Sequence, residues 1–277
     1  MKTIFSFGHY SMNAFGMFIG LGIVLGVLVA IKEAKRKKYS TDAITDLMMY
    51  AVIFGIVGAR LYYVLVFNLE YYLTNPGKII AVWDGGLSIQ GALIGGALVS
   101  LIYARVKKIN LWRAADIMAP GIILGQAIGR VGCDVFGYAM KNEYFWGIFR
   151  NGQVLHPTQM YESMLNFILF GVIWARRKSV KYDGQLFFTY LIGFSINRFI
   201  VEFFRTNPIF IEPFTVAHAT SIGLILISFI SLKLLSTRYK DNEEVEDKKY
   251  SISTKEVLLI LVMMIASILI YYNWIWS

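Results

Sequence analysis

The 277-residue sequence has few charged side chains: Asp, Glu, Lys and Arg make up 16% of it, against 57% for hydrophobic residues. Soluble globular chains carry charge on about a quarter of their residues, so this composition excludes an ordinary soluble domain and indicates an integral membrane protein. The chain has one cysteine, Cys133, and three widely separated histidines, His9, His156 and His218. This scarcity excludes an intrachain disulfide framework and a cysteine-rich zinc site. We expect neither a metal nor another cofactor.

The charge that is present is mostly positive, with 27 Lys and Arg against 18 Asp and Glu. A nucleic-acid partner would require a basic face on a soluble fold, and we expect none. The first apolar run is long and continues into a basic cluster, so we expect it to be retained as a membrane span and not cleaved as a signal peptide.

Eight apolar runs have about the length that a helix needs to cross a bilayer. They lie at 12–31, 45–67, 88–104, 115–133, 159–175, 185–204, 216–235 and 256–276. The sequence therefore predicts an all-α, polytopic membrane helix bundle with eight spans. We divide it into a membrane domain at 1–236, a charged cytoplasmic linker at 237–254 and an additional transmembrane helix at 255–277.

The basic residues between the spans predict the orientation. Five follow the first span, four follow the third, four follow the fifth and six flank the gap after the seventh, which makes 19 of the 27. Because basic residues concentrate on the cytoplasmic side of membrane proteins, this distribution places both termini outside.

Three arginines fall within predicted spans, namely Arg60, Arg130 and Arg198. A guanidinium at a helix centre costs about 2.5–3.5 kcal/mol on insertion scales, so such residues usually face a protein interior and serve a function. All three lie toward the outer ends of their spans, as do Glu162 and Glu202. This pattern predicts a polar, net-positive cavity that opens toward the outer leaflet; the alternative is that each arginine reaches the headgroups singly.

Arg198 and Glu202 are four residues apart and therefore share one helix face, and Arg205 lies three residues further along that face. Arginine suits bidentate binding of phosphate, and Arg130 could add a second contact from another span. The stretch HPTQMYE, His156 to Glu162, places an imidazole and a carboxylate where the chain re-enters the membrane. Two alternatives remain open: the Glu–Arg pair only neutralises itself, or the histidine is a structural hydrogen-bonding residue.

Five motifs, in order along the chain, resemble the bacterial prolipoprotein diacylglyceryl transferases. They are GARLYYVL (58–65), WDGGLSIQGALIGG (83–96), APGIILGQAIGRVG (119–132), HPTQMYE (156–162) and NRFIVEFFR (197–205). The resemblance implies a seven-span core, to which this chain adds an eighth span. It also implies an enzyme of the bacterial plasma membrane that transfers the diacylglyceryl group of phosphatidylglycerol to the lipobox cysteine of a prolipoprotein signal peptide, forming a thioether.

The resemblance also implies which residues form the site. The candidate catalytic residues are Arg130, Arg198, Glu202, His156 and Gln90. The candidate substrate-binding residues are Arg60, Trp83, Asp84, Gly91, Glu162, Gln159 and Arg205.

The sequence departs from the family pattern at several of these positions. Gln90 replaces a histidine, Cys133 and Asp134 replace Asn-Phe, and Phe15 replaces a tyrosine. Glutamine has no titratable nitrogen, so the thiol proton would pass to His156, to Glu202 or to the phosphate itself. A lipid-binding paralogue without activity and a membrane anion or lipid transporter remain as alternatives.

Overall fold

The computed structural model describes residues 3–7, 10–82, 85–207, 209–212, 214–239 and 252–275. Eight long helices lie within the eight predicted spans or extend them by a few residues. They are α1 (Ala14–Arg36), α2 (Thr41–Phe67), α4 (Ile89–Val106), α5 (Leu111–Val131), α6 (Thr158–Arg176), α7 (Gln185–Glu202), α8 (Val216–Tyr239) and α9 (Thr254–Ile270). Five of them, α1, α2, α4, α8 and α9 with the turn that follows it, are long and apolar enough to cross a membrane. The predicted class, an all-α polytopic membrane protein, is confirmed.

The other three long helices are less apolar because they carry half of the buried polar or charged residues among those described. α5, α6 and α7 have 21, 19 and 18 residues, and at 1.5 Å per residue these lengths approach the thickness of a bilayer core. That all three cross the membrane stays a prediction.

Shorter elements, which the sequence did not predict, connect the helices. They are α3 (Leu69–Thr74), the 3-10 helix η1 (Pro76–Ile80), the π-helical turn η3 (Tyr271–Ile275) and three antiparallel hairpins, β1 (Thr3–Phe7) with β2 (Tyr10–Asn13), β3 (Ile148–Arg150) with β4 (Gln153–Leu155), and β5 (Ile209–Ile211) with β6 (Phe214–Thr215). In the second hairpin Ile148 pairs with Leu155 and Arg150 with Gln153. Residues 240–251, most of the predicted linker, lie outside the described residues.

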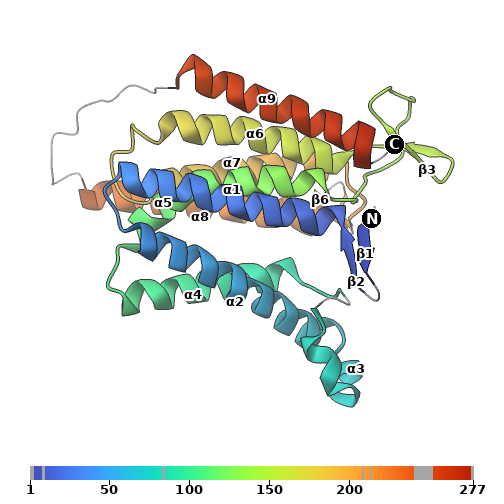
Figure 1. Cartoon of the computed structure of the whole chain (residues 1–277), viewed down its shortest axis with the longest axis horizontal. Helices are drawn as coiled ribbons and strands as arrows, with labels where there is room; N and C mark the ends of the chain where they lie inside the picture. The colour runs from blue at the N-terminus through green and yellow to red at the C-terminus, as the bar shows by residue number, and fades with distance from the viewer. Residues whose placement is uncertain are drawn as a thin grey trace. The chain divides into compact units, whose positions relative to one another are not determined.

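The chain forms two compact units, residues 31–114 and the remainder, and we describe each by itself. In the smaller unit α2 and α4 pack side by side (Figure 1). A Cβ at Gly91 would lie 2.2 Å from the carbonyl oxygen of Gly58, and one at Gly95 would lie 2.3 Å from that of Phe54. Glycine at these positions allows the two helices to pack closely, since any side chain would force the two backbones apart.

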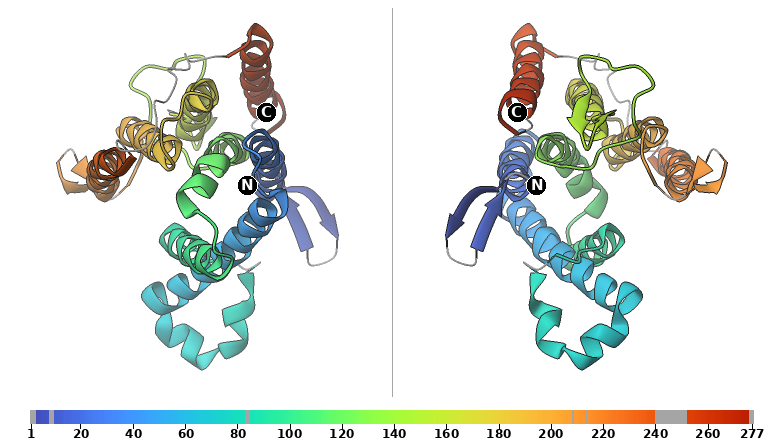
Figure 2. Two further views of the ribbon diagram at one scale, coloured as in Figure 1. Left: turned by 90° about the vertical axis from the view of Figure 1, so that its left-hand side faces the viewer. Right: turned by 90° about the vertical axis from the view of Figure 1, so that its right-hand side faces the viewer.

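In the larger unit α6, α7 and α8 pack in sequence, and α9 packs on α6 (Figure 2). The core includes Phe167 and Ile173 of α6, Ile123 of α5 and Tyr271 of η3. Polar contacts also join these helices: the Ser163 hydroxyl donates to the carbonyl of Ala127 at 2.8 Å. The buried polar face of α6 is therefore shared with its neighbours.

The α9 helix is fastened to α6 at both ends. The Glu256 carboxylate lies 2.8 Å from Arg177 Nη2 and accepts a hydrogen bond from the Trp174 indole at 2.7 Å. At the other end the Gln159 amide donates to the Tyr271 hydroxyl at 2.6 Å. These contacts hold the additional helix in register with α6.

Candidate functional site

Five charged side chains from three helix ends form one cluster in the larger unit. Arg130 Nε, at the end of α5, lies 2.9 Å from Glu162 Oε1 of α6. Arg198 Nη1 and Arg205 Nη1 lie 3.7 and 3.5 Å from the other oxygen of Glu162. Arg198 Nη2 also lies 3.2 Å from Glu202 Oε2. The structure therefore brings Arg130, Arg198, Arg205, Glu162 and Glu202 together through ion pairs. That they form a substrate site stays a prediction.

The cluster combines buried acids with partly exposed bases. The side chains of Glu162 and Glu202 are 1% and 0% exposed, whereas those of Arg130 and Arg198 are 24% and 22% exposed. Three guanidinium groups face two carboxylates, which leaves one positive charge in excess. Because the arginines reach the surface and the acids do not, that excess charge is open to an anion.

The contacts to the second oxygen of Glu162 are long. Oε2 makes no hydrogen bond among the described residues, and neither does Nε of Arg205. Buried polar groups are normally satisfied, so these unpaired atoms indicate a site with spare capacity for a ligand. A phosphate, with several acceptor oxygens, could use donors of Arg198 and Arg205 that Glu162 satisfies poorly.

The segment after α5 holds Arg205 in place. The backbone of Gly137 bridges that of Arg205, and Tyr138 N donates to the carbonyl of Phe204 at 3.0 Å. A Cβ at Gly137 would lie 1.9 Å from this same carbonyl, so only glycine allows the two segments to approach. Burial lowers the pKa of Arg205, and the positive charges of Arg198 and Arg130 lower it further.

Cys133 lies beside Arg130, at the position where the sequence departs from the family pattern. Arg130 Nη1 donates to Cys133 Sγ at 3.8 Å, and Cys133 is buried. Phe15, another departure, lies in the first turn of α1, and a Cβ at Gly132 would lie 3.0 Å from its Cα. The ends of α5 and α1 therefore bring two of the departures close to the cluster.

His156 forms a separate, uncharged group. Its Nδ1 lies 3.1 Å from the Tyr161 hydroxyl, which accepts a hydrogen bond from the Trp146 indole at 3.1 Å. The tautomer of His156 determines which of these two groups donates the hydrogen bond between them. Burial lowers the pKa of His156. Its contacts match the alternative of a structural hydrogen-bonding residue, and Gln159 likewise serves packing through Tyr271.

In the smaller unit Arg60 binds neutral groups. Its guanidinium donates to the carbonyls of Lys78, Ile79, Gly85 and Gly86, at distances of 2.5 to 2.9 Å. The residue is 5% exposed. Arg60 therefore secures the loop between α2 and α4 and has a structural role in this unit.

The remaining candidates of the smaller unit lie on or near α4. Gln90 is exposed, and its side-chain oxygen accepts from the Ser88 hydroxyl at 2.6 Å. Gly91 packs against α2 and lines an apolar groove of about 520 Å³ between these two helices. Trp83 and Asp84 lie outside the described residues.

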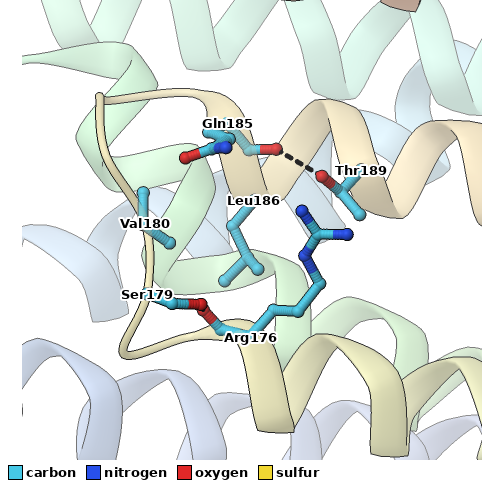
Figure 3. Close-up of a pocket in the computed structure, with 6 residues that line it drawn as sticks. All are labelled: Arg176, Ser179, Val180, Gln185, Leu186 and Thr189. Carbon is cyan, nitrogen blue, oxygen red and sulfur yellow. Dashed lines mark hydrogen bonds between the residues drawn. The ribbon is translucent and has the colours of Figure 1, made fainter. Parts of the chain in front are cut away.

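A pocket at the other ends of α6 and α7 is small. It is lined by Arg176, Ser179, Val180, Gln185, Leu186 and Thr189, with the Thr189 hydroxyl turned back to the Gln185 carbonyl at 2.8 Å (Figure 3). Its volume of about 10 Å³ admits about one water molecule. This pocket is too small for a lipid headgroup.

The fold and the cluster define a multi-pass membrane protein with a buried, net-cationic site. Residues 2–234 match the family described as prolipoprotein diacylglyceryl transferase, and the chain belongs to that family. It is 39% identical over 257 residues to a phosphatidylglycerol–prolipoprotein diacylglyceryl transferase of Bacillus cytotoxicus, covering 88% of this chain and 93% of the relative. The protein of the same name from Bacillus cereus is 38% identical over 258 residues, with the same coverage.

Proposed function

We propose that this protein transfers the diacylglyceryl group of phosphatidylglycerol to a cysteine thiol in the lipobox of a prolipoprotein signal peptide. The sulfur forms a bond to the glyceryl carbon, the bond from that carbon to the phosphate oxygen breaks, and glycerol phosphate leaves. The observation that supports the proposal is the excess guanidinium charge around Glu162, together with membership of the family.

The cluster suits this reaction because the charge on phosphate increases as the bond breaks. The phosphodiester carries one negative charge, which balances the excess charge of the cluster. The leaving phosphate monoester gains a second charge, and guanidinium groups already in place stabilise it without reorganising. Arg130 and Arg198 each keep donors beyond those that face Glu162, because the guanidinium has five N–H groups.

The leaving phosphate is the proton acceptor that the contacts favour. Glu202 Oε1 already accepts hydrogen bonds from Asn207 at 2.7 Å and Thr215 at 2.8 Å. Its Oε2 makes no hydrogen bond among the described residues but forms an ion pair with Arg198 at 3.2 Å, which protonation would remove. His156 Nδ1 is occupied by Tyr161. A phosphate monoester has a second pKa of about 6, so the leaving group can take the thiol proton as the carbon–oxygen bond breaks.

Gln90 and Phe15 favour a second candidate, a lipid-binding protein of the same family that no longer catalyses transfer. Both replace residues that the family pattern supplies, and neither side chain can donate or accept a proton as a histidine or tyrosine would. Under this alternative the cluster binds the headgroup, and no thioether forms.

A transfer assay distinguishes the two candidates. Purified full-length protein in phosphatidylglycerol nanodiscs is incubated with a lipobox peptide, and the thioether product is measured by mass spectrometry. We expect product with the wild type and with Arg238→Ala, a matched loss of one exposed arginine on α8. If the wild type binds lipid but forms no product, and Gln90→His does form product, the second candidate is established. If the wild type neither binds lipid nor forms product, both candidates are overturned.

We also propose the orientation predicted by the basic residues, with both termini outside, and the charged linker on the cytoplasmic side. Reporter fusions after Lys108 and after Ser277 test it. A fusion after Lys108 that reports an outside location, or one after Ser277 that reports the cytoplasm, would overturn this orientation.

A further inference from the structure

The start of α8 resembles a helix capping box with one residue changed. In a capping box, a Thr or Ser precedes the helix, and the side chain of a Glu or Gln three residues later accepts from its backbone N–H. Here Thr215 precedes α8, and Nδ1 of His218 accepts from the Thr215 N–H at 3.1 Å. A histidine therefore takes the place of the usual acid or amide.

This arrangement leaves the Thr215 hydroxyl free to donate elsewhere. Oγ1 lies 3.2 Å from His218 Nδ1 and 2.8 Å from Glu202 Oε1. Since Nδ1 already accepts from the backbone and Glu202 is an acceptor, the hydroxyl hydrogen goes to the carboxylate. Thr215 thereby connects the start of α8 to the acid that pairs with Arg198.

The two oxygens of the Glu202 carboxylate have different partners. Thr215 and Asn207 both donate to Oε1, and Oε2 lies 3.2 Å from Arg198 Nη2. Two donors on one oxygen restrict rotation of the carboxylate about its last bond. The direction in which Oε2 faces Arg198 therefore depends on these two hydrogen bonds.

His218 suits this position because it caps the helix without adding negative charge. It is 1% exposed, and the rings of Phe199, Phe203 and Phe214 lie 4.7, 4.5 and 5.5 Å from it between centroids. A glutamate there would bring a second carboxylate toward Glu202 in an apolar environment, where an unpaired charge is costly. A neutral acceptor gives the cap without a buried charge, although Nε2 of the ring is left with no hydrogen-bond partner among the described residues.

We propose that Thr215 and His218 are positioning residues that orient Arg198 through Glu202. This inference rests on the proposed function, because it assigns the pair to the same phosphate site. Neither residue touches the phosphate in this account. Their contribution is to the direction of the Arg198 guanidinium in the transition state, so their loss should lower kcat more than it changes KM.

The test compares substitutions that keep or remove the hydrogen bonds at nearly constant volume. Thr215→Val should lower kcat at least about 10-fold, since small misplacements of a catalytic group can cost up to about 10²-fold, with KM for phosphatidylglycerol changed less than about threefold. Thr215→Ser should restore kcat to near the wild-type value. Thr220→Val, an exposed threonine of α8 whose hydroxyl bonds only its own helix, should behave as wild type.

A second pair covers the case in which Thr215→Val does not fold. His218→Gln keeps a neutral acceptor and should retain activity, whereas His218→Phe keeps a ring but no acceptor and should lower kcat. Equal kcat in Thr215→Val and Thr215→Ser, or in the two His218 variants, would overturn the inference.

The proposed function can fail separately. If the wild type makes no thioether, the transferase proposal is wrong, and the positioning inference is then judged by lipid binding. The wild type should melt at a higher temperature in phosphatidylglycerol than in phosphatidylcholine nanodiscs, and Thr215→Val should lose that difference while Thr215→Ser keeps it. A lipid-dependent difference that is unchanged in Thr215→Val would contradict the inference.

Discussion

The arginines within the predicted spans of this chain are paired in two different ways. Around Glu162, Arg130, Arg198 and Arg205 face carboxylates, with one positive charge left over and long contacts to one oxygen. In the other unit, Arg60 faces four main-chain carbonyls at short distances. The first set has unused capacity for an anion, and the second has its donors occupied.

The difference shows that an arginine within a membrane span is not by itself evidence of a ligand site. Carbonyl dipoles can satisfy a guanidinium fully while leaving its charge unneutralised, and the residue then fastens a loop. A site for an anion requires charges that are close together and incompletely paired. Substitutions that act on one set and not the other test this distinction.

The largest effect is expected from Glu162→Ala. Removing one partner of a buried ion pair costs about 3–5 kcal/mol, and here three guanidinium groups lose their shared acid. We expect a large fall in melting temperature together with loss of transfer activity. Glu162→Gln keeps the volume and one acceptor oxygen, so it should recover part of the stability but little activity. Wild-type melting of Glu162→Ala would show that the cluster contributes nothing to the fold.

Arg130→Ala should lower the rate of transfer more than it lowers stability. Loss of one transition-state donor costs about 10²–10³ in rate, whereas the protein keeps Arg198 and Arg205 against Glu162. Arg130→Lys should recover little, because lysine lacks the planar group that binds phosphate in two places. The rate of transfer per folded molecule is the measurement, and a rate within threefold of wild type would contradict the assignment.

Arg60→Ala should show the opposite pattern. It leaves four loop carbonyls without their donor, which we expect to lower the free energy of unfolding by about 2 kcal/mol. Binding of phosphatidylglycerol by the folded protein should change little. Thermal unfolding and lipid binding, measured on the same sample, separate the two effects. A loss of lipid binding with unchanged stability would place Arg60 in the site after all.

The smallest effect is expected from His156, whose hydrogen-bond partner is neutral, and it should appear as a pH-dependent change in melting temperature. Burial lowers its pKa, so the unfolded chain, with a value of about 6.5, takes up the proton first as the pH falls. The stabilisation is therefore complete at pH values above the pKa of the unfolded state, and it is lost as the pH falls toward the pKa of the folded state. Melting temperatures of wild type should therefore drop more between pH 7.5 and about 5.5 than those of His156→Gln. Parallel curves would contradict this account.

The fold was predictable to the extent that it depends on apolar length. All eight apolar runs lie in helices, as their length predicts, since a helix satisfies the backbone hydrogen bonds of an apolar segment within itself. The hairpins show no alternating pattern, since β3 and β4 are three residues each. The second hairpin nevertheless had a local signal: Asn151 and Gly152, between the paired Arg150 and Gln153, both have positive φ, and Asn-Gly is typical of such two-residue loops.

The site was predictable where helical spacing brings residues together, as for Arg198 and Glu202. The contact between Arg130 and Glu162 joins two helices, and the sequence indicated it only because both charged residues lie near the outer ends of their predicted spans. The same reasoning predicts Arg60 in the cavity, which stays a prediction; the sequence could not show the loop carbonyls that Arg60 binds. It missed Thr215 and His218 as partners of Glu202, although a threonine three residues before a histidine at a helix start is a signal that a capping-box search could have included.

The most direct test of the central claim is the rate of thioether formation by Arg198→Ala, measured with phosphatidylglycerol and a lipobox peptide beside wild type and Arg238→Ala. The account predicts product from wild type and Arg238→Ala, and a rate per folded molecule at least about 10²-fold lower from Arg198→Ala. Turnover by Arg198→Ala at the wild-type rate would show that the cluster around Glu162 is not where the phosphate binds.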